Sequence, residues 1–73
     1  MKAHTYSILF LHRGIWKTIN DENNKRIEFQ SVEDAKRHID SLRKDKNHPI
    51  NLVKYAVIYK FDKGMMTGAG IRY

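Results

Sequence analysis

Only one stretch of the chain has the spacing of an amphipathic helix, and a serine defines where that helix begins. The apolar positions that repeat at three- and four-residue intervals are Val32, Ala35, Ile39 and Leu42. Ser31 precedes them as an N-cap, and Asp34 three residues later resembles the second half of a capping box. Pro49 disfavours helical backbone at the residue before it, so we expect the helix to end near Lys46 or Asn47. The rest of the core must therefore come from strands.

Three short segments before the helix have the composition and alternation of strands. We expect strands over residues 5–12, 15–20 and 26–29. Arg13 and Gly14 separate the first two segments, and the glycine accepts the positive φ that a tight hairpin turn requires. These connections are short, so the three segments are expected to form an antiparallel meander.

Two further strands are expected after the helix, over residues 51–61 and 65–73. Alternation in the first predicts that one face, toward the helix, carries Val53, Tyr55, Val57, Tyr59 and Phe61. The face that points away then carries Lys54, Ala56, Ile58 and Lys60. Glycines at positions 68 and 70 indicate that the last segment is an edge strand.

These elements predict an α+β fold in which residues 1–73 form a single domain. The predicted order is β-β-β-α-β-β, giving an antiparallel sheet of four to five strands with one helix packed on one face. No cysteine is present, so no disulfide and no cysteine-based zinc site can support so short a chain. Its apolar run, residues 6–11, is too short for a signal peptide or a membrane span, so we expect a cytoplasmic protein with no membrane partner.

The chain is basic, with 14 Lys and Arg residues against 8 Asp and Glu residues and a formal net charge of +6. Such an excess favours polyanionic partners, although it can also serve solubility alone. Five basic and four acidic residues fall within residues 31–46, so the helix itself is nearly neutral. Acids four residues ahead of bases, Glu33 before Arg37 and Asp40 before Lys44, predict ion pairs along its outer surface. The excess positive charge therefore lies on strands and turns.

Basic residues of the strands and turns, together with the helix flank, are the candidate binding residues. We expect Arg26, Lys54 and Lys60 to point from the sheet face opposite the helix, where Trp16 would offer a ring for base stacking. The alternative for Trp16 is a place in the core, as is usual for large aromatic residues. The full candidate set for a protein or nucleic-acid partner is Arg13, Trp16, Arg26, Lys36, Arg37, Lys54 and Lys60.

No catalytic, metal-binding or cofactor-binding pattern is evident. The four histidines fit no metal-ligand spacing, and the serines have no nucleophile motif. The glycines of "GMMTGAG" are not followed by the lysine and helix of a phosphate-binding loop. We therefore expect a binding protein that is not an enzyme and needs no cofactor.

Two known families resemble parts of the chain. "HRGIWKTI" followed by "FQSVEDAKRHID" resembles the three-strands-then-helix pattern of AP2-type and integrase arm-type DNA-binding domains, over residues 12–40. The matching positions are Trp16, Ile19, Phe29, Ser31 and Ala35. Because those domains read the major groove with the open face of their sheet, the resemblance implies direct DNA binding. The chain departs from the pattern by adding two strands after the helix.

"IEFQSVEDAKR" is similar to the strand-to-helix junction of small phage anti-CRISPR proteins that inhibit type I surveillance complexes. The similar positions are Ile27, Gln30, Ser31, Ala35, Lys36 and Arg37. That family has one helix on a five-stranded antiparallel sheet and competes with target DNA on the backbone subunits of the complex. The resemblance implies a phage or mobile-element inhibitor in the host cytoplasm, whose partner is a host protein or nucleoprotein complex.

Three functions follow as expectations. The first is a non-catalytic, anti-CRISPR-like inhibitor that blocks nucleic-acid binding by a host effector complex. The second is a small DNA-binding regulator that uses the open sheet face. The third is a dimerising interaction domain with Tyr55, Tyr59 or Tyr73 at a sheet edge, so the chain is expected to be a monomer or a homodimer.

Overall fold

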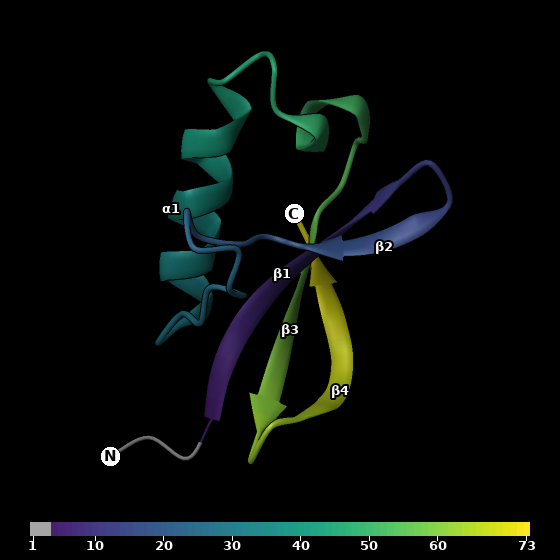
Figure 1. Ribbon diagram of the computed structural model, residues 1–73. Coiled ribbons are helices and arrows are strands. Elements are labelled where there is room, and N and C mark those ends of the chain that lie inside the picture. The colour runs from purple at the N-terminus through teal and green to yellow at the C-terminus, as the bar shows by residue number, and fades with distance from the viewer. Residues whose placement is uncertain (1–3) are drawn as a thin grey trace.

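The computed structural model describes residues 4–73, which form a four-stranded antiparallel sheet with one α-helix on one side (Figure 1). The strands are β1 (His4–His12), β2 (Ile15–Thr18), β3 (Val57–Asp62) and β4 (Met65–Arg72). Their order across the sheet is β2-β1-β3-β4. The helix α1 spans Val32–Arg43, and a 3-10 helix, η1, spans Pro49–Leu52. The predicted α+β class and antiparallel sheet are confirmed, but the order β-β-β-α-β-β is wrong because the helix follows two strands.

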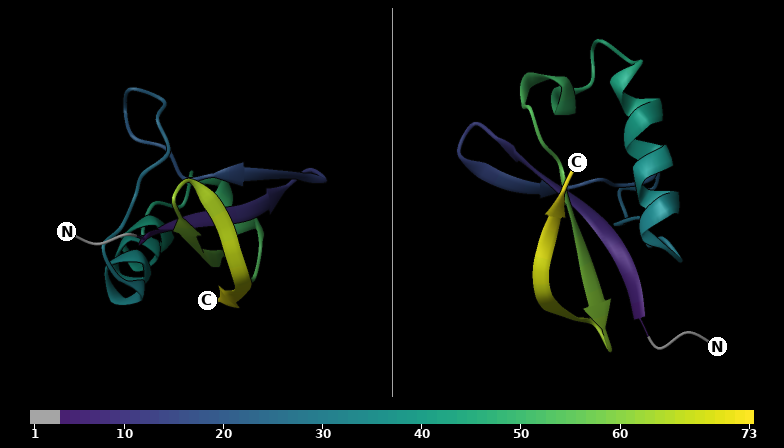
Figure 2. Two further views of the ribbon diagram at one scale, coloured as in Figure 1. Left: turned by 90° about the horizontal axis from the view of Figure 1, so that it is seen from below. Right: turned by 180° about the vertical axis from the view of Figure 1, so that it is seen from behind.

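The first two strands form the predicted hairpin. Arg13 and Gly14 make its turn with φ angles of 54° and 80°, the left-handed pair that matches the twist of a two-residue hairpin. Register across the hairpin places Leu11 opposite Trp16. After β2 the chain forms a loop, which lies on the side of β1 away from α1 (Figure 2, left).

The predicted strand over residues 26–29 is not formed. Phe29 exchanges two backbone hydrogen bonds with Tyr6, of 2.8 and 2.9 Å, but this bridge is isolated. The next position along the edge of β1 is already occupied, because the Ile8 carbonyl accepts from the Ile19 amide at 3.0 Å. Ile27 therefore donates to Ile19 instead, and no continuous ladder develops.

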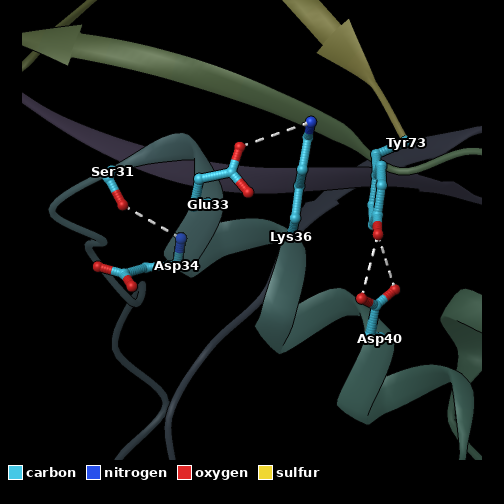
Figure 3. A network of polar contacts seen from close by, with 6 residues as sticks. All are labelled: Ser31, Glu33, Asp34, Lys36, Asp40 and Tyr73. Carbon is cyan, nitrogen blue, oxygen red and sulfur yellow. Dashed lines mark hydrogen bonds and ion pairs between the residues drawn. The ribbon is translucent and has the colours of Figure 1, made fainter.

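The N-terminus of α1 agrees with the sequence, and its C-terminus does not. Ser31 Oγ accepts a hydrogen bond from the Asp34 amide at 3.1 Å, as the capping pattern predicts (Figure 3). The helix ends at Arg43, ahead of the predicted Lys46 or Asn47. The Asn51 side chain donates to carbonyls in this region, to Leu42 at 3.2 Å and to Asp45 at 2.5 Å. The amide thus satisfies the Leu42 carbonyl, which a longer helix would have bonded to the amide of Lys46, and the Asp45 carbonyl, to which Pro49 has no N–H to donate.

The segment after α1 begins with a 3-10 helix where a strand was predicted. Pro49 occupies the first turn of η1, where its missing N–H costs nothing, and His48 Nδ1 accepts from the Ile50 amide at 3.1 Å. Ile50 is fully buried, so this turn contributes to the core. The predicted strand over residues 51–61 is therefore shortened to β3.

The core lies between α1 and one face of β1 and β3. Its fully or nearly buried apolar members are Ile8, Phe10, Ile19, Ala35, Ile39, Ile50, Ala56 and Ile58. Ile58 lies opposite Ile8, so the even-numbered residues of β3 face the helix side. The predicted alternation of β3 is wrong, since Val57, Tyr59 and Phe61 lie on the other face. The prediction placed the face with the larger aromatic rings in the core, whereas the core contains the smaller Ala56 and the β-branched Ile58.

Ion pairs form along the outer surface of α1, but they join residues three positions apart and not four as predicted. Glu33 lies 3.9 Å from Lys36, and Asp34 lies 2.5 Å from Arg37. The predicted i,i+4 pairs of Glu33 with Arg37 and of Asp40 with Lys44 are absent from residues 4–73. Asp40 instead contacts a distant part of the chain.

Tyr73 joins the end of β4 to α1 (Figure 3). Its backbone exchanges two 2.9 Å hydrogen bonds with Ala56, and its hydroxyl donates to the two carboxylate oxygens of Asp40 at 3.0 and 3.1 Å. The Lys36 ammonium lies 5.4 Å from the centroid of the tyrosine ring. The hydrogen bond to Asp40 raises the pKa of Tyr73, so the phenol stays protonated and continues to donate. Edge strand and helix are thereby linked across 33 residues of sequence.

Substituting Gly70 will destabilise the fold. A Cβ at this position would collide with Val57 Cγ1 and would lie 2.9 Å from Tyr59 Cε1. We expect Gly70→Ala to lower the free energy of unfolding by about 1–3 kcal/mol through overpacking, measured by chemical denaturation. Adding Val57→Ala removes the first atom that the new methyl group meets. The double variant should therefore lose less stability than the two single losses together, and strict additivity would contradict this contact.

Histidine protonation will make the fold less stable in acid. His38 lies with its ring centroid 5.2 Å from that of Phe29, and burial, followed by the charge of His48, lowers its pKa. The unfolded chain, with an ordinary histidine pKa near 6.5, then binds protons more readily than the folded chain. We expect the free energy of unfolding to fall as the pH drops below about 6.5, and His38→Gln to make that slope shallower. An unchanged slope in the variant would exclude His38 as the cause.

Candidate binding cleft on the open face of the sheet

The sheet face opposite α1 is called the open face here. Register defines it, because Leu9 pairs with Val57 and Leu11 pairs with Trp16, all on the side away from Ile8. Part of this face is covered near Ser7, which is fully buried and whose Oγ donates to the Ile27 carbonyl at 3.4 Å. The uncovered part lies toward the β1–β2 hairpin.

A cleft of about 370 Å³ lies on this uncovered part. Its lining residues are Leu11, Trp16, Val53, Lys54, Tyr55, Val57 and Arg72. They come from all four strands and from the connection between η1 and β3. The cleft therefore exists only in the folded sheet, and no single sequence segment encodes it.

Two aromatic rings in the cleft are exposed to solvent. Trp16 is 56% exposed and Tyr55 is 54% exposed, while Leu11 beside them is 40% exposed. Of the two alternatives for Trp16, the structure supports the surface position and contradicts a place in the core. Large aromatic residues are mostly buried, so two exposed rings in one cleft make this surface a candidate binding site.

The charged residues that line the cleft are both cations. Lys54 and Arg72 contribute the positive charge, and no carboxylate is among the lining residues. Neither cation belongs to an ion pair in the part of the chain that the structure describes. The Arg72 guanidinium carbon lies 5.6 Å from the centroid of the Tyr55 ring, so cation and ring face the same space. The cleft thus combines stacking surfaces with positive charge.

Arg43 of α1 holds the connection that supplies one wall of the cleft. Its guanidinium donates to the carbonyls of Ile50 at 2.7 Å, Val53 at 2.9 Å and Lys54 at 3.1 Å. A planar guanidinium with several fixed donors suits this arrangement, whereas a lysine ammonium does not. Lys54 and its neighbour Tyr55 are therefore positioned from the helix side of the molecule.

The structure places four of the seven predicted binding residues on or near the open face. Trp16 and Lys54 line the cleft, and Arg13 is exposed in the adjoining hairpin turn. Arg26 lies further along, with its guanidinium carbon 4.1 Å from the centroid of the Phe61 ring and a 3.2 Å ion pair to Glu28.

The other three predicted residues lie elsewhere. Lys36 and Arg37 are on α1 and pair with acids of the same helix. Lys60 lies opposite Tyr6 in the register, on the same side of β3 as Ile58. Its predicted place on the open face is therefore wrong, because the alternation of β3 is inverted relative to the prediction. Their roles in binding stay predictions.

Sequence reasoning missed Tyr55 and Arg72 as partners of Trp16. Tyr55 was assigned to the helix side as part of a strand over residues 51–61, but it lies in the connection before β3, where Lys54 and Tyr55 both line the cleft. Arg72 lies opposite Val57, so a correct register for β3 and β4 would have placed it on the open face. The missing signal was the pairing of the strands, which no local pattern in the sequence contains.

No protein-family model, curated protein or solved structure matches this chain. Across residues 4–73, no helix has the length and apolar character to cross a membrane. The same residues contain no group of three or more acidic or histidine side chains arranged to hold a metal ion.

Loss of the Arg43 guanidinium will loosen the wall of the cleft. Arg43→Met keeps most of the side chain's apolar length and removes all three hydrogen bonds. We expect it to lower the free energy of unfolding by at least about 2 kcal/mol, because charge-assisted bonds to partly buried carbonyls are lost. Arg37→Met is the matched control, since its ion pair is exposed and contributes less than about 1 kcal/mol. Equal losses in denaturant titrations of the two variants would contradict this role of Arg43.

Proposed function

We propose that the chain is a non-catalytic binding protein that holds nucleic acid, free or within a host nucleoprotein complex, in the cleft on its open face. The observation that carries the proposal is the exposure of Trp16 and Tyr55 beside Lys54 and Arg72, with no acid in the lining. Ring faces stack on bases, and cations contact phosphates. The net charge of +6 supports the same class of partner.

The distribution of charge favours the open face over the helix. On α1, Lys36 and Arg37 already pair with acids of the same helix. In the cleft, Lys54 and Arg72 have no such partners among residues 4–73. A phosphate there meets no competing carboxylate from the lining, so binding does not require an internal ion pair to break. The unpaired cations of the cleft therefore support direct DNA binding more than they support the action of an inhibitor.

An anti-CRISPR-like inhibitor is the second candidate, and the edge strand β4 favours it. β4 is the last strand of the sheet order, and its Met65 and Met66 are 70% and 48% exposed. Exposed apolar side chains on an edge strand suit a protein partner that extends the sheet. The expected partner is a type I surveillance complex or a related host complex, with the chain blocking access of target DNA.

The hypothesis of a dimerising interaction domain has less support. Of the three tyrosines expected at the dimer interface, Tyr73 is engaged with Asp40 within the same chain. Tyr59 packs where a Gly70 side chain would be, and only Tyr55 is more than half exposed. Tyr55 lies in the cleft and not on the outer edge of a strand.

Reversing the two cleft cations tests the proposal. Lys54→Glu/Arg72→Glu should weaken binding to a labelled oligonucleotide by about tenfold or more at low salt, because phosphate contacts dominate such affinity. The dependence of log affinity on log salt should also become shallower. Fluorescence anisotropy over a series of salt concentrations measures both quantities.

Lys17→Glu/Lys63→Glu is the matched control. It makes the same change in net charge with two exposed lysines, Lys17 on the side of the sheet opposite the cleft and Lys63 in the turn between β3 and β4. Similar losses in both double variants would show that total charge, not the cleft, drives binding and would refute the proposal. If the Lys54→Glu/Arg72→Glu variant still prevents a surveillance complex from binding target DNA as fully as the native chain does, the second candidate is favoured.

A further inference from the structure

The cleft is shaped for a base that is not paired. We infer that its occupant is an unpaired base of a single-stranded nucleic acid, stacked on Trp16 and Tyr55, with the neighbouring phosphates on Lys54 and Arg72. This inference rests on the proposed function and adds the form of the nucleic acid.

Stacking on an exposed ring requires a base with a free face. In a duplex each base is covered above and below by its neighbours, whereas single strands offer their faces to aromatic side chains. Trp16 and Tyr55 each expose more than half of their surface. They are contributed by β2 and by the connection before β3, so two separate segments present rings to one space.

The concave form of the site disfavours a double helix. Proteins read the major groove with a helix or a β-ribbon that protrudes into it. Here the rings line a hollow of about 370 Å³, which is within the size range of sites for small organic groups. A hollow of that size accepts a flat base that leaves its stack.

The polar chemistry of the lining predicts binding that tolerates sequence. The lining residues include no Asn, Gln, Ser or Thr, so the polar side-chain groups of the cleft are the two cations, the hydroxyl of Tyr55 and the indole N–H of Trp16. The Arg72 guanidinium presents a fork that matches a phosphate, and Lys54 supplies a point charge from the adjoining wall. Base edges thus meet few hydrogen-bonding groups, and stacking with phosphate contacts accounts for the affinity.

The sequence supplies its own probe for this inference. Trp16 is the single tryptophan of the chain, so intrinsic tryptophan fluorescence reports on the cleft alone. We expect a short oligothymidylate to quench this fluorescence on binding. We also expect it to bind about tenfold or more tightly than a duplex at equal phosphate concentration. A thymidylate and a mixed-sequence strand of equal length should bind with similar affinity.

Ring variants separate stacking from simple charge attraction. Tyr55→Ala should weaken single-strand binding by roughly fivefold or more, while Tyr55→Phe keeps the ring and should bind nearly as the native chain does. Thermal unfolding of both variants checks that the fold is intact. A Tyr55→Ala variant that is folded and binds unchanged overturns the inference.

The outcomes for the two proposals are distinct. Equal affinity for duplex and single strand, without quenching of Trp16, overturns the single-strand inference. If Lys54→Glu/Arg72→Glu still weakens that binding, the proposed function stands. Binding to neither nucleic acid, alongside capture by a surveillance complex alone, overturns the inference and leaves the second candidate.

Discussion

The three hydrogen bonds from Arg43 join α1 to the segment that leads from η1 into β3. The guanidinium binds the carbonyls of Ile50, Val53 and Lys54, so one side chain of α1 fixes the path by which the chain returns to the sheet. Ile50 is thereby kept in the core while Lys54 reaches the opposite side. Residues held by Arg43 therefore belong both to the core and to the cleft.

Local signals predicted the elements that local contacts determine. The cap at Ser31 and the turn at Arg13 and Gly14 involve residues within a few positions, and both agree with the sequence. The end of α1 depends on the Asn51 amide, and the loss of the predicted third strand depends on Ile19 occupying the Ile8 carbonyl. Such contacts join distant residues, so periodicity and propensity alone do not reveal them.

The candidate site was predicted in part for the same reason. Charge and aromatic content singled out Trp16 and Lys54, which do line the cleft. The predicted alternation over residues 51–61 assigned Tyr55 to the core side and Lys60 to the open face. The observed pairing of Ile58 with Ile8 reverses the placement of Lys60, and Tyr55 lies in the cleft because the chain before β3 is not a strand. When both faces of a strand carry apolar residues, the sequence alone does not indicate which face is buried, because burial depends on the neighbouring strands and the helix that packs on the sheet.

The hydrogen bonds between Tyr73 and Asp40 have a consequence for the affinity expected under the proposed function. Arg72 immediately precedes Tyr73 at the end of an edge strand, a place where backbone ordinarily frays. Anchoring Tyr73 to α1 restricts the backbone of Arg72 before any partner arrives. Entropy that a loose strand end would lose on association is then already lost in folding, so more of the interaction energy of the cation appears as affinity. Under the proposed function, the helix, which is neutral and self-paired, thus contributes to recognition by preorganising a residue on the far side of the sheet.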